Sequence, residues 1–413
     1  MTPRLIVLIG MAVLCAQPGA AQTLVLNGDS GARLAWLRIF ASPQDDWIND
    51  IVPISGRRYL AVGFLGRSDG VAAPDWRALA VALRADGTIL RQRTYGQAGG
   101  IDAFWSARES PDGRLTFAGF TTRIGAGGID AWVLNAAPDG RLLRERAFGG
   151  AGYDRFTSLA PAGDGFVFVG HSQRPGEDRR RLYAVRTDRE GAPVWERVIE
   201  SETSLGGLYV EPMPDGGFVL SGGIEQDGHD DIIVLKLDAE GREQWRRILG
   251  APEAEDTNHG LAVLPNGNIV VTGYSQSWGA RGNDIFAATL SPEGAVLRQA
   301  MIGGADDDRP ILAKADAQGR VWVVGYTRSA GAGGWDLIFV RLDAAGAFEP
   351  GAITLGAAGD DQGTAVRPLA DGSVLVGGYS DALGGGGQDA FVARITAPSF
   401  AHARPDFDAR IIR

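Results

Sequence analysis

Aspartate recurs at two regular positions along this chain, and its carboxylates are the first candidates for chemistry. One series precedes a short apolar segment and consists of Asp46, Asp102, Asp154, Asp256, Asp308 and Asp361. The other precedes a later apolar segment and consists of Asp130, Asp231, Asp284, Asp336 and Asp389. Carboxylates combined with loop carbonyls suit Ca²⁺, which is the one cofactor that the pattern leaves open. The alternative is that each aspartate accepts loop N–H groups and caps its segment, and recurrence in nearly every unit favours capping.

Three tryptophans fall in expected loops on the same side as these aspartates. They are Trp47, Trp278 and Trp335. Exposed aromatic rings in such loops can stack on sugars or anchor a peptide, with Arg281 and residues 179–181 as polar partners. The alternative is that each ring covers the edge of a neighbouring structural unit. The ligand-binding hypothesis therefore has Trp47, Trp278, Trp335 and Arg281 as its candidate residues.

Residue sets that are typical of catalysis do not occur in this sequence. The four histidines are scattered, without the HExxH spacing of a metal site, and there is no G-x-S-x-G nucleophile motif. Glycine-rich stretches such as "GGGGQD" (384–389) precede a predicted strand, whereas a phosphate-binding loop opens a helix. We therefore assign no catalytic residue.

These candidates sit in a repeat that fills most of the chain. The glycine that ends each apolar run of the type "VWVVG" recurs about every 52 residues, at Gly63, Gly119, Gly170, Gly222, Gly273, Gly325 and Gly378. Each unit holds short apolar segments separated by turns such as "SPDG" (110–113). Four short antiparallel strands at a fixed period are typical of a propeller blade. The sequence predicts an all-β fold, a seven-bladed β-propeller of four-stranded antiparallel blades.

The seventh unit lacks a fourth strand, and a matching segment stands near the N-terminus. "ARLAWLRIF" (32–40) resembles "REQWRRIL" (242–249), with Trp36 in the place of Trp245 and Trp195. The N-terminal strand is therefore predicted to complete the last blade. The resulting domain boundaries are a leader at 1–21, the propeller at 22–399 and a C-terminal tail at 400–413.

The repeat resembles the bacterial β-propeller repeat family known as SBBP over about residues 32–396. The family phrase stands here as Gly325-Tyr326-Thr327 with Asp336, and again at 378–380 followed by "DAFV" at 389–392. Units one and three depart from it, with Arg77 and Arg181 where the acid of the third segment belongs, and unit four lacks the first acid. The resemblance implies a propeller in an exported bacterial protein and assigns no activity.

The first residues have the features of an export signal. "MTPR" carries positive charge, residues 5–15 form an apolar core, and small residues suit cleavage after Ala21. The core is shorter than the roughly 20 residues that span a membrane. Lipid attachment at Cys15, the single cysteine, is the alternative. We expect a periplasmic or secreted protein without a membrane span.

Charge and composition narrow the possible partners. The formal net charge is −10 and the pI about 5.0, which disfavours nucleic acid and anionic lipid. We expect a monomeric, exported, non-enzymatic binding or scaffolding module whose loop-rich face takes a protein or glycan ligand. The alternative is an extracytoplasmic propeller enzyme, either a glycan hydrolase or lyase or a quinoprotein-like oxidoreductase.

Overall fold

The computed structural model describes residues 24–27, 31–67, 75–251, 254–384, 387–396, 400 and 407–412. The predicted leader, with Cys15 and the cleavage site at Ala21, lies outside these residues. Every regular element in the described part of the chain is a β-strand. A search of the same residues finds no helix long and apolar enough to cross a membrane.

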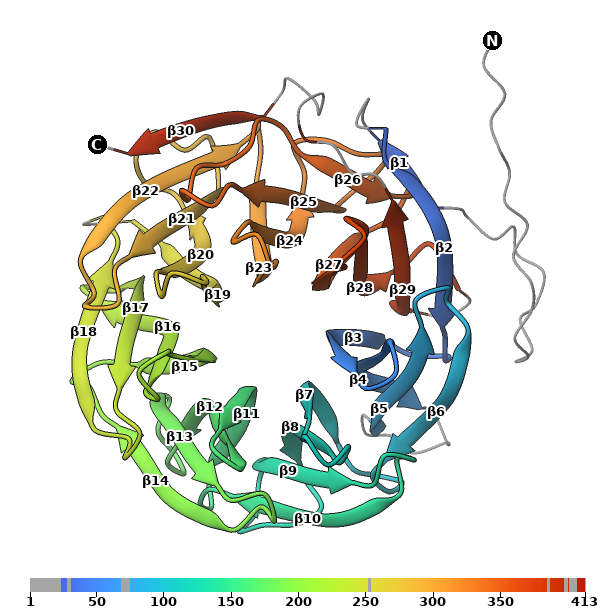
Figure 1. Ribbon diagram of the computed structural model, residues 1–413, viewed down its shortest axis with the longest axis vertical. Helices are drawn as coiled ribbons and strands as arrows, with labels where there is room; N and C mark the ends of the chain where they lie inside the picture. The colour runs from blue at the N-terminus through green and yellow to red at the C-terminus, as the bar shows by residue number, and fades with distance from the viewer. Residues whose placement is uncertain are drawn as a thin grey trace.

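Seven sheets stand in a ring around a central axis, which confirms the predicted seven-bladed propeller (Figure 1). The first strand of each blade is innermost. Blades one to three consist of β3 (Asp46–Ile54), β4 (Arg58–Arg67), β5 (Asp75–Arg84) and β6 (Ile89–Tyr95); β7 (Ala103–Glu109), β8 (Leu115–Thr121), β9 (Asp130–Ala136) and β10 (Leu142–Phe148); and β11 (Tyr153–Ala162), β12 (Gly165–Gln173), β13 (Arg181–Thr187) and β14 (Pro193–Ile199).

Blades four to seven follow the same plan. They consist of β15 (Leu205–Pro212), β16 (Phe218–Gln226), β17 (His229–Leu237) and β18 (Glu243–Leu249); β19 (Asp256–Val263), β20 (Ile269–Ser275), β21 (Asp284–Leu290) and β22 (Val296–Gly303); β23 (Asp308–Ala315), β24 (Val321–Thr327), β25 (Asp336–Leu342) and β26 (Ile353–Gly356); and β27 (Asp361–Pro368), β28 (Val374–Ser380), β29 (Asp389–Thr396) and β2 (Arg33–Phe40).

The N-terminal strand closes the ring, as the sequence predicts. Strand β2 pairs antiparallel with β29, from Arg33 opposite Thr396 to Phe40 opposite Ala390. Two short strands then extend other blades. Strand β1 (Val25–Asn27) pairs with β26 in blade six, and β30 (Asp408–Ile412) pairs with β22 in blade five. Residues 408–412, in the segment that we take from sequence as a tail, are thus an outer strand of blade five.

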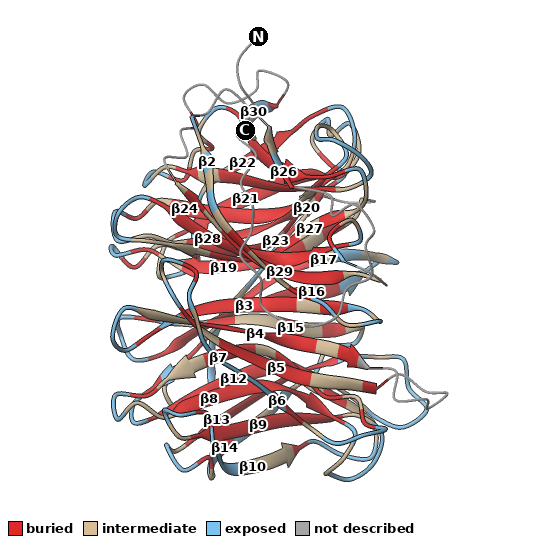
Figure 2. Cartoon of the chain, turned by 90° about the vertical axis from the view of Figure 1, so that its right-hand side faces the viewer, coloured by how far each residue is buried: buried red, intermediate tan, exposed pale blue. Residues whose placement is uncertain are grey.

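Neighbouring blades bury their faces against each other, and Figure 2 shows that the buried residues run through the strands while the connecting loops are exposed. The cluster between blades three and four joins Val169 and Leu182 to Leu220, Ile233 and Leu235. Burial of apolar surface on both faces of every sheet supplies the main stabilising term of the ring.

A second contact ties the outer strand of each of several blades to a turn of the next blade. The Trp195 indole N–H donates to the Ala239 carbonyl at 3.0 Å, and Trp245 makes the equivalent bond at 3.2 Å. Across the closure, the Trp36 indole donates to the Ala85 carbonyl at 2.9 Å. The predicted match of Trp36 to the other two tryptophans is therefore confirmed by its contacts.

Each innermost strand contains a β-bulge after the second to fourth residue of its ladder. The residues that the register skips are Asn49, Trp105, Thr157, Leu208, His259 with Gly260, Ile311 and Thr364. The repeat-defining glycines face this bulge. A Cβ at any of them would lie 1.8–2.0 Å from a carbonyl oxygen of the first strand. These glycines are needed because the bulge brings the two backbones together.

Candidate functional site

All the repeated aspartates except Asp231 are buried, and several accept hydrogen bonds from the loops before them. In the first series, Asp154 accepts the Gly150 N–H at 2.8 Å and Asp308 accepts the Gly304 N–H at 2.7 Å. In the other series, Asp336 accepts the N–H of the residue four positions earlier at 3.0 Å. These contacts are those that capping requires.

The two series meet in pairs between blades. A Cβ at Gly356 would lie 1.7 Å from one carboxylate oxygen of Asp336 and 3.1 Å from one of Asp361. Within the described ranges, no group of three or more His, Cys, Asp or Glu side chains could hold a metal ion. Calcium binding stays a prediction from sequence, and the geometry of these pairs is that of caps on neighbouring strands.

Burial perturbs the titration of these carboxyl groups. It raises the pKa of Asp46 and of Asp308 to about 7, although hydrogen bonds from Ser42 and Thr327 act in the opposite direction. It also raises the pKa of Asp361 to about 6. Desolvation by burial disfavours the charged form, so these aspartates bind protons in the folded chain at a pH where the unfolded chain has lost them.

The free energy of unfolding is therefore expected to fall as the pH rises from about 4 to about 7. A raised carboxyl pKa stabilises the fold fully below the unfolded value of 3.8, and this stabilisation is lost as the pH rises through the folded value. Asp46 and Asp308 should each contribute a loss on the order of 4 kcal/mol over this window. Burial lowers the pKa of His171 to about 2 and of His259 to about 4, so between those values and 6.5 only the unfolded chain holds their protons, and the two histidines oppose part of this fall. Urea denaturation at several pH values measures the slope.

Asp308→Asn is the matched variant for this prediction, because its amide stays neutral. It should remove the contribution of Asp308 and make the slope shallower, and an unchanged slope would contradict the assignment. The same series with EDTA should give the same midpoints, since each carboxylate is held by loop N–H groups. A lower midpoint after chelation would instead support structural calcium.

The structure separates the predicted aromatic candidates. Trp47 stacks on Tyr379 with ring centroids 4.5 Å apart and lines a cavity in the channel. Trp335 does not line this cavity, but its ring packs against Tyr326, which does, with the two ring centroids 4.7 Å apart. Trp278 instead stacks on Phe286 of its own blade at 5.3 Å.

The predicted arginine partners lie apart from the channel wall. Arg281 is exposed in the loop before Asp284. Arg181 is buried and pairs with Glu177 and with Glu200. Of the predicted binding residues, only Trp47 lines the channel directly, and neither Arg281 nor Arg181 is part of that wall.

The channel holds a cavity of about 490 Å³ beside the first aspartate series. Its wall contains the bulged residue of every blade: Asn49, Trp105, Thr157, Leu208, His259, Ile311 and Thr364. A bulge turns its extra residue out of the ladder, which aims these side chains at the axis. Trp47, Tyr326 and Tyr379 complete an aromatic side of the wall. A cavity of this size can enclose a small organic ligand.

Charged side chains line a second cavity next to this one. Lys314 lines both cavities, the second of which has a volume of about 370 Å³, and bonds Glu211 at 2.9 Å. Asp50 pairs with Arg108 at 3.3 Å. Although burial acts to raise it, the pKa of Asp50 is lowered by the positive charges of Arg108, Lys314 and Arg367. Asp50 is therefore ionised in the channel at neutral pH.

Sequence reasoning missed these channel residues because it followed the residues that repeat. The positions that follow the first acid of each unit, including the third, differ from blade to blade, whereas the acid itself and the glycine that defines the repeat recur. This variation was the signal that the sequence offered. It does not by itself reveal the bulge, which becomes visible only in the strand register of the structure.

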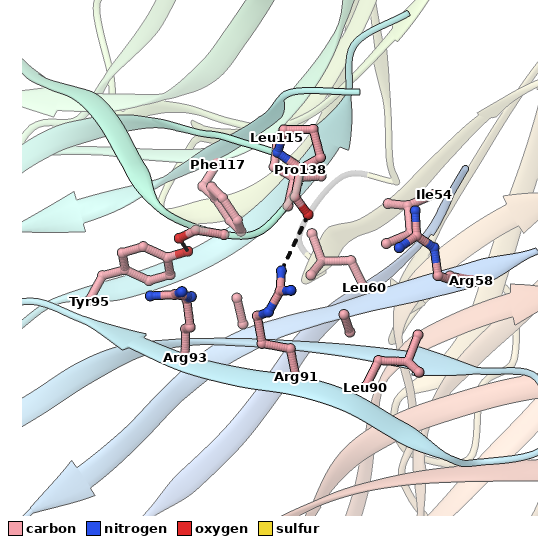
Figure 3. Close-up of a pocket in the computed structure, with 13 residues that line it drawn as sticks. Ile54, Arg58, Leu60, Leu90, Arg91, Arg93, Tyr95, Leu115, Phe117 and Pro138 are labelled. Carbon is pink, nitrogen blue, oxygen red and sulfur yellow. Dashed lines mark hydrogen bonds between the residues drawn. The ribbon is translucent and has the colours of Figure 1, made fainter. Parts of the chain in front are cut away.

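A smaller hollow between blades one and two belongs to the blade contacts (Figure 3). Its volume is about 50 Å³. Tyr95 donates its hydroxyl to the Gly140 carbonyl at 2.6 Å, and Arg91 reaches the Pro138 carbonyl at 3.5 Å. Arg91 stands at the register position that Trp195 and Trp245 hold in blades three and four, and it contacts the equivalent turn carbonyl. The hollow has room for a few waters but not for a sugar-sized ligand.

Comparison with known families agrees with the repeat. A model described as a β-propeller repeat, SBBP, matches residues 244–277. A second model, described as a β-propeller domain of unknown function, matches residues 369–397. No curated protein matches the chain by sequence.

Solved structures share the architecture at low sequence identity. Kuenenia stuttgartiensis hydrazine synthase matches with a TM-score of 0.52 at 13% identity, over 89% of this chain and 95% of that one. A gluconolactonase from Xanthomonas campestris matches with a TM-score of 0.43 at 14% identity, over 93% and 99% of the two chains. Chaetomium thermophilum Sqt1 matches with a TM-score of 0.48 at 12% identity, over 88% and 98%. Likeness at this level concerns the fold alone.

Proposed function

Because the chain is built from β-propeller repeats of the SBBP type, we propose that it is an exported, non-enzymatic module that binds a small ligand in the channel cavity. The observation that carries this proposal is the ring of bulged residues. Seven blades of one repeat place different side chains around one cavity. Structural needs of a repeat are the same in each blade, so a ring of side chains that differ from blade to blade and line one cavity supports a role in recognition.

The wall combines aromatic faces with a small number of polar groups. Trp47 and Tyr379 stack at 4.5 Å, and the Trp47 indole N–H is fixed by Gln388 at 2.8 Å. Rings held in this way present flat apolar surfaces at little entropic cost, which suits a sugar or another small cyclic ligand.

An enzyme remains the second candidate, favoured by one observation. Asp50, Tyr209 and His259 break the repeat and line the same cavity. Tyr209, however, donates its hydroxyl to the Ile311 carbonyl, and Asp50 is paired with Arg108. These bonds give the side chains structural partners and favour binding over proton transfer. Product analysis after long incubation with any bound sugar would reveal turnover.

Trp47→Ala is expected to weaken binding about tenfold for hits from a panel of neutral and acidic monosaccharides, because a stacking surface of about 1–1.5 kcal/mol is lost. Trp278→Ala is the control, since Trp278 packs on Phe286 away from the cavity. Calorimetric titration of both variants gives the comparison. Equal affinities of the two variants, or no binding by the parent, would reject the channel site.

A further inference from the structure

Unpaired polar atoms cluster on one side of the channel cavity. Buried side-chain atoms without a hydrogen-bond partner include Asp50 Oδ1, Trp105 Nε1 and Arg155 Nε, and all three residues line the cavity. They come from blades one, two and three, so they form one continuous sector of the wall. A buried polar atom without a partner costs about 1–3 kcal/mol, and a bound ligand can supply that partner.

Arg155 is the charged member of this sector. Its guanidinium lies over the Trp105 ring, 5.3 Å from the centroid, and no ion pair within the described ranges includes it. Burial lowers its pKa, with Arg180 adding a second positive charge nearby. Tyr153 offsets part of this cost, but a half-buried cation without an ion pair is still disfavoured, so an anionic ligand group beside it would be stabilising.

The equivalent arginine of blade six provides a direct comparison. Arg309 also follows the first acid of its unit, but it pairs with Asp307 at 3.0 Å and is not part of the cavity wall. The same position in the repeat thus carries a neutralised arginine in one blade and an unneutralised one in another. This difference supports a ligand in the cavity as the anionic partner of Arg155.

The departures of units three and four from the repeat do not themselves charge the cavity. Arg181 and Leu205 begin β13 and β15, where other blades have the paired aspartates. Arg181 is paired with Glu177 and Glu200 and does not line the cavity. Of the two cationic residues in the described cavity wall, Lys314 pairs with Glu211, so Arg155 is the one without an ion pair.

We infer, building on the proposed binding function, that the ligand is a small carboxylate that also bears hydroxyl groups. Its carboxylate would accept hydrogen bonds from Arg155 and from the Trp105 indole N–H. A hydroxyl would donate to Asp50 Oδ1, and the aromatic wall would cover the ring. Asp50 is itself negative, so a monoanionic carboxylate fits better than a dianionic phosphate.

Calorimetry with D-glucuronate, D-glucose, cyclohexanecarboxylate and glucose 6-phosphate tests the ligand class on the parent chain. We expect glucuronate to bind at least tenfold more tightly than each of the other three. Equal affinity for glucose would overturn the inference and leave the proposed binding function intact. No binding of any of the four by the parent would overturn the inference as well, whereas the proposed function stands if another monosaccharide binds.

Variants test the residues. Arg155→Gln should weaken glucuronate binding about 10- to 100-fold while glucose binding stays within about twofold. Arg309→Gln is the matched control and should leave glucuronate binding unchanged. Trp105→Phe keeps an aromatic ring, although a smaller one, removes the indole N–H, and should weaken glucuronate binding about fivefold. This second variant decides the question if Arg155→Gln does not fold, and an unchanged affinity in it would overturn the assignment.

Discussion

Deleting residues 22–41 is expected to lower the free energy of unfolding by more than about 5 kcal/mol, enough to unfold most mesophilic domains. The deletion removes β2, the fourth strand of blade seven. Leu37 and Phe40 of this strand are buried, at 4% and 5% exposure, and burying each such side chain is worth about 1.5–3 kcal/mol. The whole edge of β29 would lose its ladder partner at the same time.

The effect should exceed that of losing an ordinary outer strand, because β2 joins the two ends of the ring. It pairs with blade seven and also reaches blade one, where Trp36 donates to Ala85 and Arg38 Nε donates to the Gly87 carbonyl at 2.8 Å. Without it, the interface of blades seven and one loses these contacts together with the fourth strand of blade seven.

Two shorter truncations are the controls for this deletion. Removing residues 408–413 deletes β30, an added strand on a blade that already has four, and should cost less than about 2 kcal/mol. Removing residues 22–31 deletes β1 and keeps β2. Urea denaturation followed by tryptophan fluorescence compares the three chains. A 22–41 deletion as stable as the β30 truncation would refute closure by the N-terminal strand.

Gly222→Ala is expected to destabilise the protein by about 3 kcal/mol or more, since the new Cβ overlaps backbone and not a movable side chain. That Cβ would lie 1.8 Å from the Gly206 carbonyl oxygen. Strands β15 and β16 would have to separate at the bulge, which breaks ladder bonds and shifts Leu208 in the channel wall.

The neighbouring glycine supplies the control. A Cβ at Gly223 meets no atom within 4 Å and its φ is not positive, so Gly223→Ala should be neutral or stabilise by up to about 1 kcal/mol. Chemical denaturation of the two variants side by side measures the difference. If both cost the same, strand propensity explains the glycines and the close approach at the bulge does not.

Much of the fold could be predicted from the sequence because its repeat constrains every unit in the same way. The spacing of glycines such as Gly273 and Gly325 sets the blade period, and turns with Asp and Gly separate the strands. Closure was predictable because Trp36 stands in the same local pattern as Trp195. Strands β1 and β30 could not be predicted in this way. With three and five residues, they are too short to show a recognisable pattern of alternating apolar residues.

The site was less accessible to the same reasoning. Trp47 was found from the pattern, although it lies in strand β3 and not in the predicted loop, whereas Trp278 lies in a loop and packs into its own blade. Asp50, Trp105 and Arg155 meet only after the ring closes in three dimensions. Whether a buried polar atom lacks a partner depends on contacts between blades, and a linear pattern does not contain them.

The bulge in each innermost strand has an evolutionary consequence. The glycine and the acid around it maintain the ladder, while the extra residue leaves the ladder and is free to change. A duplicated blade thus inherits its stability with one position open to selection. Descendants of such a chain can acquire new ligands by substitutions in seven places, without having to evolve a new core.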